Sequence, residues 1–451
     1  MKVRVISRSE EAFTRERSQD VTKVFRNLDP RLHPMERAQE YTRALNAVKL
    51  DKIFAKPFIG ALSDHRDGVS CMAKNPSRLN CLVSGAMDGD VRLWDLAYRK
   101  TVAEFPGHNG AVRGVSISSD GDFLVTCGDD CTARLWELPA AEIGEVSGGV
   151  KHCEPVMVFQ DKNSFRAVDH QWEKKVFATA GANVSVWDYN RSEAMTSFSW
   201  GSETVVSVKF DPAEPDVFVT TGSDRSICLY DLRMNTPLRK LVMQTRTNAV
   251  AWNPREPFNF TAANEDCNCY TYDMRKLKFA KCIHKDHVSA VMDVDFSPTG
   301  REFVTGSYDR TVRIFSYNGG HSREIYHTKR MQRVFSVRFS GDATYVMSGS
   351  DDTNIRLWKA KASEQLGVLL PRERAKHEYL DAVKQRYKHL DEVKRIDRHR
   401  QLPKAVFKAK KLRQEMTEAA RKKESRKRAH SAPGSMPREA ARKKRIVAEL
   451  E

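Results

Sequence analysis

The residues that most resemble catalytic machinery are histidine and aspartate pairs at a nearly constant spacing. Three histidines each precede an aspartate by 22 or 23 residues: His65 with Asp88, His108 with Asp130, and His287 with Asp309. An imidazole bonded to a carboxylate is a common general base. However, no serine stands in a nucleophile-elbow context, and no glycine-rich phosphate loop is followed by lysine. We therefore interpret the pairs as structural, and predict neither an enzyme nor a cofactor.

A second group has the residue types of a metal site. Two segments supply Cys267, Cys269, Cys282, His284 and His287. Structural zinc sites favour paired cysteines on tight knuckles. Here the first two cysteines are two apart in an expected strand, and His287 already belongs to a histidine–aspartate pair. We predict no metal site.

These aspartates belong to a repeat that runs through the chain. In six places an aspartate stands six residues before an aromatic residue: Asp88 and Trp94, Asp130 and Trp136, Asp224 and Tyr230, Asp266 and Tyr272, Asp309 and Phe315, Asp352 and Trp358. A seventh copy has Gly181 and Trp187. Successive aromatic positions are 42, 51, 43, 42, 43 and 43 residues apart. This period is typical of propeller arrays.

Each repeat contains short segments with two-residue alternation, such as "AVRGVSIS" and "TARLWEL", which indicate strands. One sheet cannot bury both of its faces, whereas seven sheets around an axis cover one another. We predict an all-β, seven-bladed β-propeller at residues 53–370. The aspartate is expected in the turn that enters the third strand, bonded to the histidine, with the Trp N–H bonded nearby.

Closing the ring requires a strand from the far end of the chain. Residues 53–62 precede His65 as "RKTVAEFPGH" leads to His108. The rival segment is "EQLGVLL", residues 364–370. We favour residues 53–62, because pairing the first strand with the last locks the ring.

Charge separates the flanks from the propeller. Residues 371–451 contain 26 Lys and Arg against 12 Asp and Glu, a net +14 of the total +17, which leaves +3 for residues 1–370. A basic tail of this kind is expected to order only on a polyanion or an acidic protein.

Both flanks contain helical patterns. In the N-terminal extension, residues 1–52, one helix face is approximated by Met35, Ala38, Tyr41, Leu45 and Val48. This helix is expected to pack on the propeller rim or to dock a partner. The tail, residues 371–451, is predicted to be helical or disordered, and in a basic helix one side is formed by Tyr379, Val383, Tyr387 and Leu390.

The cellular compartment is suggested by cysteines and basic clusters. The nine cysteines are scattered, and "MKVRVISRSEE" has no secretory pattern, so we expect reduced thiols inside the cell. No apolar run approaches the ~20 residues of a membrane span. Two basic clusters resemble a bipartite nuclear-import signal: Arg421, Lys422, Lys423, Arg426, Lys427 and Arg428, then Arg442, Lys443, Lys444 and Arg445.

Two further basic groups are candidates for RNA or partner binding. In "HTKRMQRVFSVRFS" these are Lys329, Arg330 and Arg333, with His327 and Arg338 expected at the same strand connection. In "RHRQLPK" they are Arg398, Arg400 and Lys404. Lysine and arginine that displace counterions from RNA add salt-sensitive affinity.

The repeat resembles the WD-repeat family, in which Gly-His stands near the start of a repeat and Trp-Asp near its end. The first dipeptide occurs at Gly107-His108, and the second at Trp94-Asp95 and Trp187-Asp188. The spacing therefore carries this resemblance more than the dipeptides do.

Segments outside the repeat resemble the Sof family of the small-subunit processome. They include "KVRVISRSEEAFTRERSQDVTKVFRN", "FTAANEDCNCYTYDMRKL", "YHTKRMQRV" and "RHRQLPK". The resemblance implies a nucleolar scaffold that associates with box C/D small nucleolar RNA, pre-ribosomal RNA and processome assembly factors, and that is needed for small-subunit rRNA processing.

Animal relatives of that family are also described as factors associated with cullin-RING ubiquitin ligases. Adaptor binding in WD-repeat receptors is associated with a Trp-Asp-x-Arg ending. Here Tyr replaces Trp in the sequences that end at Arg233 and Arg275. The resemblance thus implies an alternative role as a ligase substrate receptor, with these arginines facing an acidic adaptor or capping their own blades.

Overall fold

The computed structural model describes residues 29–139, 150–199, 204–234, 236–437 and 439–450. The chain divides into two compact units. One unit combines Met1–Lys56 with Lys361–Arg400, and the other combines Pro57–Ala360 with Gln401–Glu451. The tail after residue 370 is therefore shared between two units, whereas the sequence suggested one separate segment.

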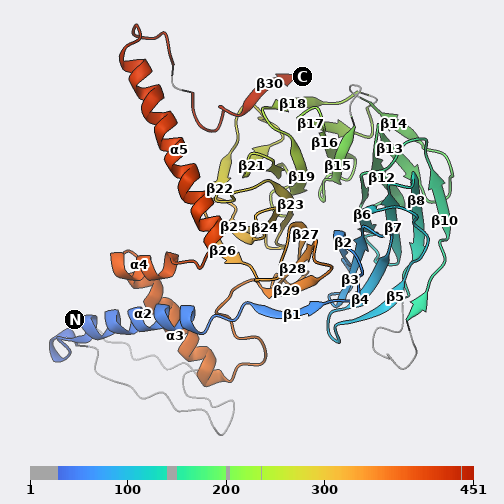
Figure 1. The fold of residues 1–451 in the computed structure, drawn as a ribbon. Helices are drawn as coiled ribbons and strands as arrows, with labels where there is room; N and C mark the ends of the chain where they lie inside the picture. Colours follow the sequence, from blue (N-terminus) through green and yellow to red (C-terminus); the bar gives the residue numbers. More distant parts are fainter. Residues whose placement is uncertain (1–28, 140–149, 200–203, 235, 438, 451) are drawn as a thin grey trace, which may run out of the picture. The chain divides into compact units, whose positions relative to one another are not determined.

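The larger unit contains seven sheets arranged as a ring (Figure 1). The innermost strand of each sheet contacts the innermost strands of both neighbouring sheets, and the last contacts the first. This arrangement confirms the predicted seven-bladed β-propeller.

The strands of blades 1 to 4 run outward from the axis. Blade 1 contains β2 (Val69–Lys74), β3 (Cys81–Ala86), β4 (Val91–Asp95), β5 (Lys100–Glu104) and the added β9 (Lys151–His152). Blade 2 contains β6 (Val112–Ile117), β7 (Phe123–Gly128), β8 (Thr132–Glu137) and β10 (Met157–Gln160). Blade 3 contains β11 (Ala167–His170), β12 (Val176–Ala180), β13 (Val184–Asp188) and β14 (Thr196–Phe198). Blade 4 contains β15 (Val205–Phe210), β16 (Val217–Gly222), β17 (Ser226–Asp231), β18 (Arg239–Met243) and the added β30 (Ile446–Leu450).

The remaining blades follow the same order. Blade 5 contains β19 (Thr247–Trp252), β20 (Asn259–Asn264), β21 (Asn268–Asp273) and β22 (Cys282–Lys285). Blade 6 contains β23 (Val291–Phe296), β24 (Glu302–Ser307), β25 (Val312–Ser316) and β26 (Ser322–Tyr326). Blade 7 contains β27 (Val334–Phe339), β28 (Tyr345–Ser350), β29 (Ile355–Lys359) and β1 (Phe58–Leu62).

The apolar core lies between the blades. Every residue of β3, β16 and β20 is buried, because neighbouring sheets cover both faces of these strands. Between blades 1 and 2, for example, Val83 and Leu93 share one apolar cluster with Val115 and Trp136. Full burial of each such side chain contributes about 1.5–3 kcal/mol.

The ring is closed by the N-terminal strand. β1 pairs antiparallel with β29, with Phe58 opposite Trp358 and Leu62 opposite Ile355. The rings of Phe58 and Trp358 lie 5.5 Å apart. Residues 364–370 form no strand. The closure predicted for residues 53–62 is confirmed, although the strand begins only at Phe58.

The repeated aspartates hold the turns between the second and third strands. In five of the six turns the carboxylate accepts the backbone N–H two residues on: Asp88, Asp130, Asp224, Asp266 and Asp309. The residue after each of the six aspartates has a positive φ: Gly89, Cys131, Arg225, Cys267, Arg310 and Thr353. Asx-turns with a left-handed residue are the chemistry that aspartate supplies here.

Two of the three predicted histidine–aspartate pairs are confirmed. His108 Nδ1 lies 2.9 Å from Asp130, and His287 Nδ1 lies 2.9 Å from Asp309. In blade 2, His108 Nε2 contacts the Thr126 hydroxyl, which also accepts the N–H of Trp136 at 2.9 Å. Burial lowers the pKa of His108 despite Asp130. A neutral ring with its proton on Nδ1 satisfies every group of this network.

The pairing of His65 with Asp88 is wrong. His65 Nε2 bonds to Ser84 Oγ at 2.6 Å, and Ser84 also accepts the N–H of Trp94. His65 Nδ1 is buried without a hydrogen-bond partner. The nearby Asp90 carboxylate binds Arg92 instead. Sequence spacing therefore located the histidine but not its partner.

The other aspartates bind different groups. Lys240 Nζ contacts Asp224 at 2.8 Å, and both Arg356 Nη atoms contact Asp352. In the blades where histidine holds the aspartate, the corresponding arginine stays about 4 Å from the carboxylate: 3.9 Å for Arg134 and 4.0 Å for Arg313. One turn position thus accepts several cations.

The smaller unit is helical. A short 3-10 helix, η1 (Pro30–Leu32), precedes α2 (Glu36–Ile53), and α2 packs against α3 (Pro371–Tyr387) and α4 (Asp391–Arg398). Its buried residues are Ala44, Ala47, Val48, Val383 and Val393. Of the predicted α2 face, Met35 precedes the helix and is 64% exposed, and Ala38 is exposed. The packed face therefore differs from the predicted one.

Polar contacts join the helices of this unit. Arg386 binds Glu40 at 2.7 Å, Lys384 binds Asp51 at 2.5 Å, and the Tyr41 hydroxyl donates to Glu392. The tail helix predicted around Tyr379 breaks between Tyr387 and Asp391. The tail helices are a partner for α2 that the sequence did not predict.

The Trp–Thr–His network predicts a graded loss of stability. Thr126→Val removes the acceptor of Trp136 and the partner of His108, whereas Thr305→Val affects only His287, because Phe315 replaces Trp in blade 6. Each unpaired buried polar group costs about 1–3 kcal/mol. In urea unfolding, Thr126→Val should lose about 1–3 kcal/mol more than Thr305→Val. Equal losses would contradict the network.

His65 predicts a pH dependence of stability. Burial lowers the pKa of His65 to about 4, so the unfolded chain, with a pKa near 6.5, binds the proton first. Stability should therefore fall as pH decreases from 7 through this window. Between pH 7 and pH 5, unfolding of wild type should lose about 2 kcal/mol more than His65→Gln. His152→Gln, at an exposed site, should retain the wild-type pH profile.

Candidate interaction surfaces

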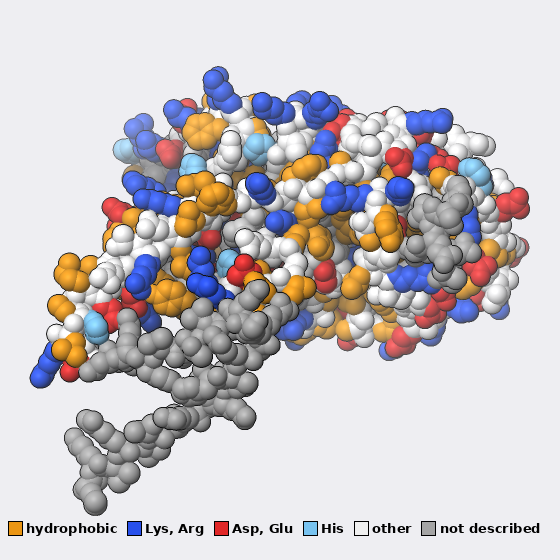
Figure 2. Space-filling view, turned by 90° about the horizontal axis from the view of Figure 1, so that it is seen from below, with side chains coloured by type: hydrophobic (Ala, Val, Ile, Leu, Met, Phe, Trp, Pro, Cys, Tyr) orange, Lys and Arg blue, Asp and Glu red, His pale blue; other side chains and the backbone are white. Residues whose placement is uncertain are grey.

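The propeller has two loop faces. One face, which we call the Asp-turn face, carries the turns between the second and third strands and the loops that lead into each inner strand. The opposite face carries the loops that leave each inner strand. Lys, Arg, Asp and Glu side chains are interspersed in the view of Figure 2.

The predicted basic loop connects β26 to β27 on the Asp-turn face. Lys329, Arg330 and Arg333 are exposed. The Arg333 guanidinium lies 5.4 Å from the centre of the Tyr308 ring. Arg338 does not belong to this group, because it lies in β27 and binds Asp293 at 2.6 Å. The structure therefore brings together three of the four predicted cations.

Helix α5 (Lys404–Ala429) begins on the same face. Lys410 Nζ lies 3.1 Å from Asp286, whose side chain is 8% exposed. The Arg413 guanidinium donates to the carbonyls of His287 and Asp266 at 2.9 and 2.7 Å. Val406 is buried. These contacts anchor the first three turns of α5 to blades 5 and 6, and sequence spacing offered no signal for them.

The end of the chain joins blade 4. β30 pairs antiparallel with the outer strand β18. Arg445, just before β30, donates to Gln244 at 2.8 Å and lies 3.6 Å from the Asp266 carboxylate. The tail was expected to order only on a partner. Instead, its described residues form α3, α4, α5 and β30, because Val406, Ile446 and the β18 edge provide contacts within the chain.

The two predicted import clusters have different environments. The first cluster, Arg421 to Arg428, lies on the second half of α5, and its Lys and Arg side chains are exposed except for Arg428, which binds Glu424. The second, Arg442 to Arg445, lies in turns before β30. Lys444 Nζ is 3.9 Å from Glu424.

The basic residues of "RHRQLPK" fall in both units. Arg398 ends α4, and Arg400 donates to the carbonyls of Asp397 and His399. Lys404 is the first residue of α5 and is exposed. The predicted triplet is therefore divided at the boundary between Arg400 and Gln401.

The two candidate adaptor arginines lie on the opposite face. Arg233 binds Asp216 at 2.7 Å, and Arg275 binds both oxygens of Asp273 at 3.0 Å while stacking on Phe258. Each arginine holds the pKa of its carboxylate partner below the usual range. The arginine side chains remain 74% and 60% exposed. Both therefore cap their own blades while presenting an accessible guanidinium.

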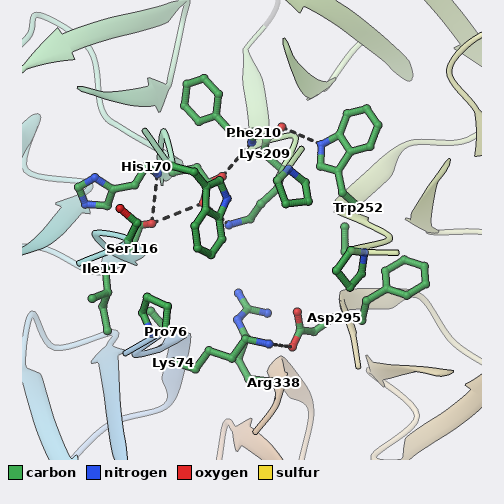
Figure 3. A pocket seen from close by; sticks show the side chains of 18 of the residues that line it. Lys74, Pro76, Ser116, Ile117, His170, Lys209, Phe210, Trp252, Asp295 and Arg338 are labelled. Carbon is green, nitrogen blue, oxygen red and sulfur yellow. Dashed lines mark hydrogen bonds and ion pairs between the residues drawn. The ribbon is translucent and has the colours of Figure 1, made fainter. Parts of the chain in front are cut away.

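A cavity of about 490 Å³ lies at the axis, where the inner strands end near the opposite face (Figure 3). Four loops that follow inner strands line it with proline: Pro76, Pro212, Pro254 and Pro298. Lys74 binds Asp295 across blade 7 at 3.3 Å, and Lys209 binds Asp169 at 2.6 Å. These ion pairs neutralise the charges that face the cavity and join neighbouring or next-neighbouring blades.

The cysteine and histidine group does not form a metal cluster within the described ranges, where no three His, Cys, Asp or Glu side chains are arranged around a common point. Cys267 lies in a turn with φ of +69°, not in a strand beside Cys269 as expected. His284 bonds to Thr271 and the Gly319 carbonyl. None of the helices in the described part of the chain could cross a membrane.

Sequence reasoning missed the acceptors of the tryptophan N–H groups. Ser84, Thr126 and Ser348 each accept from the tryptophan ten residues later. The signal was present as a Ser or Thr at constant spacing before Trp94, Trp136 and Trp358. It was hidden by the degenerate repeats.

Comparison with known proteins covers the whole chain. The family described as "Sof1-like domain" matches residues 360–446, and "WD domain, G-beta repeat" matches residues 56–95, 99–137, 280–316 and 322–359. The chain is 48% identical over 451 residues to DDB1- and CUL4-associated factor 13 of Xenopus tropicalis, covering 100% of both chains. It is 46% identical over 448 residues to the Homo sapiens protein of the same name, covering 99% of both chains.

The similarity extends to a fungal protein. Over 404 residues the chain is 46% identical to Protein SOF1 of Saccharomyces cerevisiae, covering 86% of this chain and 83% of that protein. The blades that match the repeat family include 1, 2, 6 and 7, and two of them contain the confirmed histidine–aspartate pairs. The chain belongs to the Sof1-like family of WD-repeat proteins.

Proposed function

We propose that this protein is a non-catalytic scaffold of the small-subunit processome, located in the nucleolus. It associates with box C/D small nucleolar ribonucleoprotein and supports processing of pre-ribosomal RNA to small-subunit rRNA. The observation that carries the proposal is the end-to-end similarity to SOF1, including the Sof1-like segment at residues 360–446. The propeller holds assembly-factor proteins, and the basic tail contacts RNA.

The charge distribution supports this division of roles. The propeller's arginines are often neutralised by its own carboxylates, as in Arg113 with Asp129 and Arg323 with Glu302. By contrast, the second half of α5 exposes five cations, Arg421, Lys422, Lys423, Arg426 and Lys427. A helix with cations around its circumference suits the closely spaced phosphates of RNA.

Neutralising the exposed half of α5 should weaken RNA association. Lys422, Lys423, Arg426 and Lys427 are changed together to Gln, which leaves the docking residues Lys410 and Arg413 intact. Crosslinking of the tagged protein in cells should recover about 3- to 10-fold less small nucleolar and pre-ribosomal RNA. Every variant carries the same added import sequence, so that loss of nuclear entry does not mimic loss of RNA.

The matched control removes four exposed cations from the propeller surface: Lys100, Arg191, Lys278 and Arg301. This control should recover RNA at the wild-type level. A second arm changes Lys329, Arg330 and Arg333 to Glu and tests the basic loop in the same assay. RNA recovery that is the same for wild type and the α5 variant would refute a direct role for this helix.

A second candidate function is substrate reception for a cullin-RING ubiquitin ligase. The printed name of the animal relatives, DDB1- and CUL4-associated factor 13, motivates it. Two Tyr-Asp-x-Arg sequences in adjacent blades 4 and 5 end in the accessible guanidinium groups of Arg233 and Arg275. An acidic adaptor would compete with Asp216 and Asp273 for them.

Arg233→Ala combined with Arg275→Ala separates the two functions. If the ligase role holds, pulldown of the ligase adaptor is lost while small-subunit rRNA maturation in depleted cells is rescued normally. Arg233→Lys with Arg275→Lys keeps the charge but not the bidentate geometry, and should bind the adaptor with intermediate strength. Unchanged adaptor recovery by the alanine variant would remove these residues from the interface.

A further inference from the structure

The tail completes an aspartate turn that has no histidine. In blade 5, Asp266 occupies the same turn position as Asp130 and Asp309, but its side chain, 7% exposed, lacks the histidine partner of those blades. It accepts the hydroxyl of Tyr270, and its cation is Arg445 at 3.6 Å. Arg413 binds the backbone carbonyl of the same residue. Two separate parts of the tail therefore converge on one turn.

The chain after Arg445 is held as a fifth strand of blade 4. Val242 lies opposite Ala448, and Lys240 lies opposite Leu450. Ile446 packs against the apolar cluster between blades 4 and 5. Arg239 lies 3.9 Å from Glu449, whose side chain is 10% exposed. We call residues 442–450 the C-terminal latch.

The latch includes the second basic cluster and fixes its backbone. Ala280 N–H donates to the Arg442 carbonyl at 3.1 Å, and Gln244 donates to the carbonyls of Lys444 and Arg445 at 2.8 and 3.0 Å. Within the cluster, the N–H groups of Lys443 and Lys444 both donate to the Ala440 carbonyl. The cluster is therefore held in turns rather than in an extended conformation.

We propose that the latch masks the second half of the nuclear-import signal. A receptor groove that reads successive Lys and Arg side chains needs the segment extended, at about 3.3 Å per residue. The closed latch engages the backbone of Arg442, Lys444 and Arg445 with the propeller, so closure and receptor binding exclude each other. The occupant is a receptor with an acidic groove, selected by the four adjacent cations. This inference rests on the proposed nuclear function.

The masking is a population effect. A receptor binds only the open form, so its apparent affinity decreases in proportion to the open fraction. Closure depends on strand pairing, Ile446 burial and the Arg445 contacts, which all lie on a sheet edge. Edge strands present unpaired backbone groups and exchange partners readily, which makes opening accessible without unfolding a blade.

A disulfide across the latch tests this directly. Val242→Cys with Ala448→Cys places two cysteines at opposite positions of β18 and β30, where antiparallel Cα distances of about 4.5–5.5 Å suit a disulfide. The probe is a purified armadillo-repeat nuclear-import adaptor, titrated against the full chain. The oxidised variant should bind at least about 10-fold more weakly than the same protein after reduction.

An opening variant provides the opposite change. Ala448→Pro cannot continue strand pairing and leaves all four cations of the cluster in place. It should bind the adaptor about 3-fold or more tightly than wild type. Ala448→Val, which is compatible with a strand, should bind as wild type does, and each single cysteine variant should be insensitive to reductant.

Each outcome decides the proposal. Equal adaptor affinity for the oxidised and reduced double-cysteine protein overturns the latch, as does an Ala448→Pro variant that binds no better than Ala448→Val. If no form binds the adaptor, the cluster is not an import signal and the latch masks nothing. RNA recovery by crosslinking is measured separately, so the scaffold proposal could fail or stand independently of these results.

Discussion

The need to cover both faces of every sheet governs this structure. The middle strands of the blades are apolar on both sides, so each sheet is stable only between two neighbours, and the last sheet only if the ring closes. β1 provides that closure by pairing with β29. The Lys359 N–H donates to the Pro57 carbonyl, so the chain enters and leaves blade 7 at one place. The segments before Pro57 and after Ala360 can therefore form one helical unit.

The aspartate turns illustrate how one backbone requirement accepts several chemical solutions. The carboxylate fixes the turn through the N–H two residues on, and its remaining oxygen takes whichever cation or donor the blade supplies. This is histidine in blades 2 and 6, lysine in blade 4, arginine in blade 7, and the tail's Arg445 in blade 5. Pairing with a distant segment makes this last site sensitive to whether the tail is docked.

Sequence periodicity could predict the blades because a propeller repeats one local unit. It could also predict the His108 and His287 pairs, because each partner lies on the next loop of the same face. It failed for His65, where Ser84 is the closer partner, and for Arg338, where a two-residue alternation turned the side chain toward Asp293. In the tail, periodicity indicated helices but not their ends, because short basic helices are defined by the surfaces they contact.

The sequence by itself determined the seven blades, the turn aspartates and the concentration of positive charge in the tail, since these follow from local spacing and composition. Only the tertiary structure decided the partners of the tail. Helices α3 and α4 pack with α2, while α5 and β30 join the propeller, through contacts between residues up to about 350 positions apart. Such pairings depend on which edges and carboxylates the folded ring leaves open, and no local pattern encodes them.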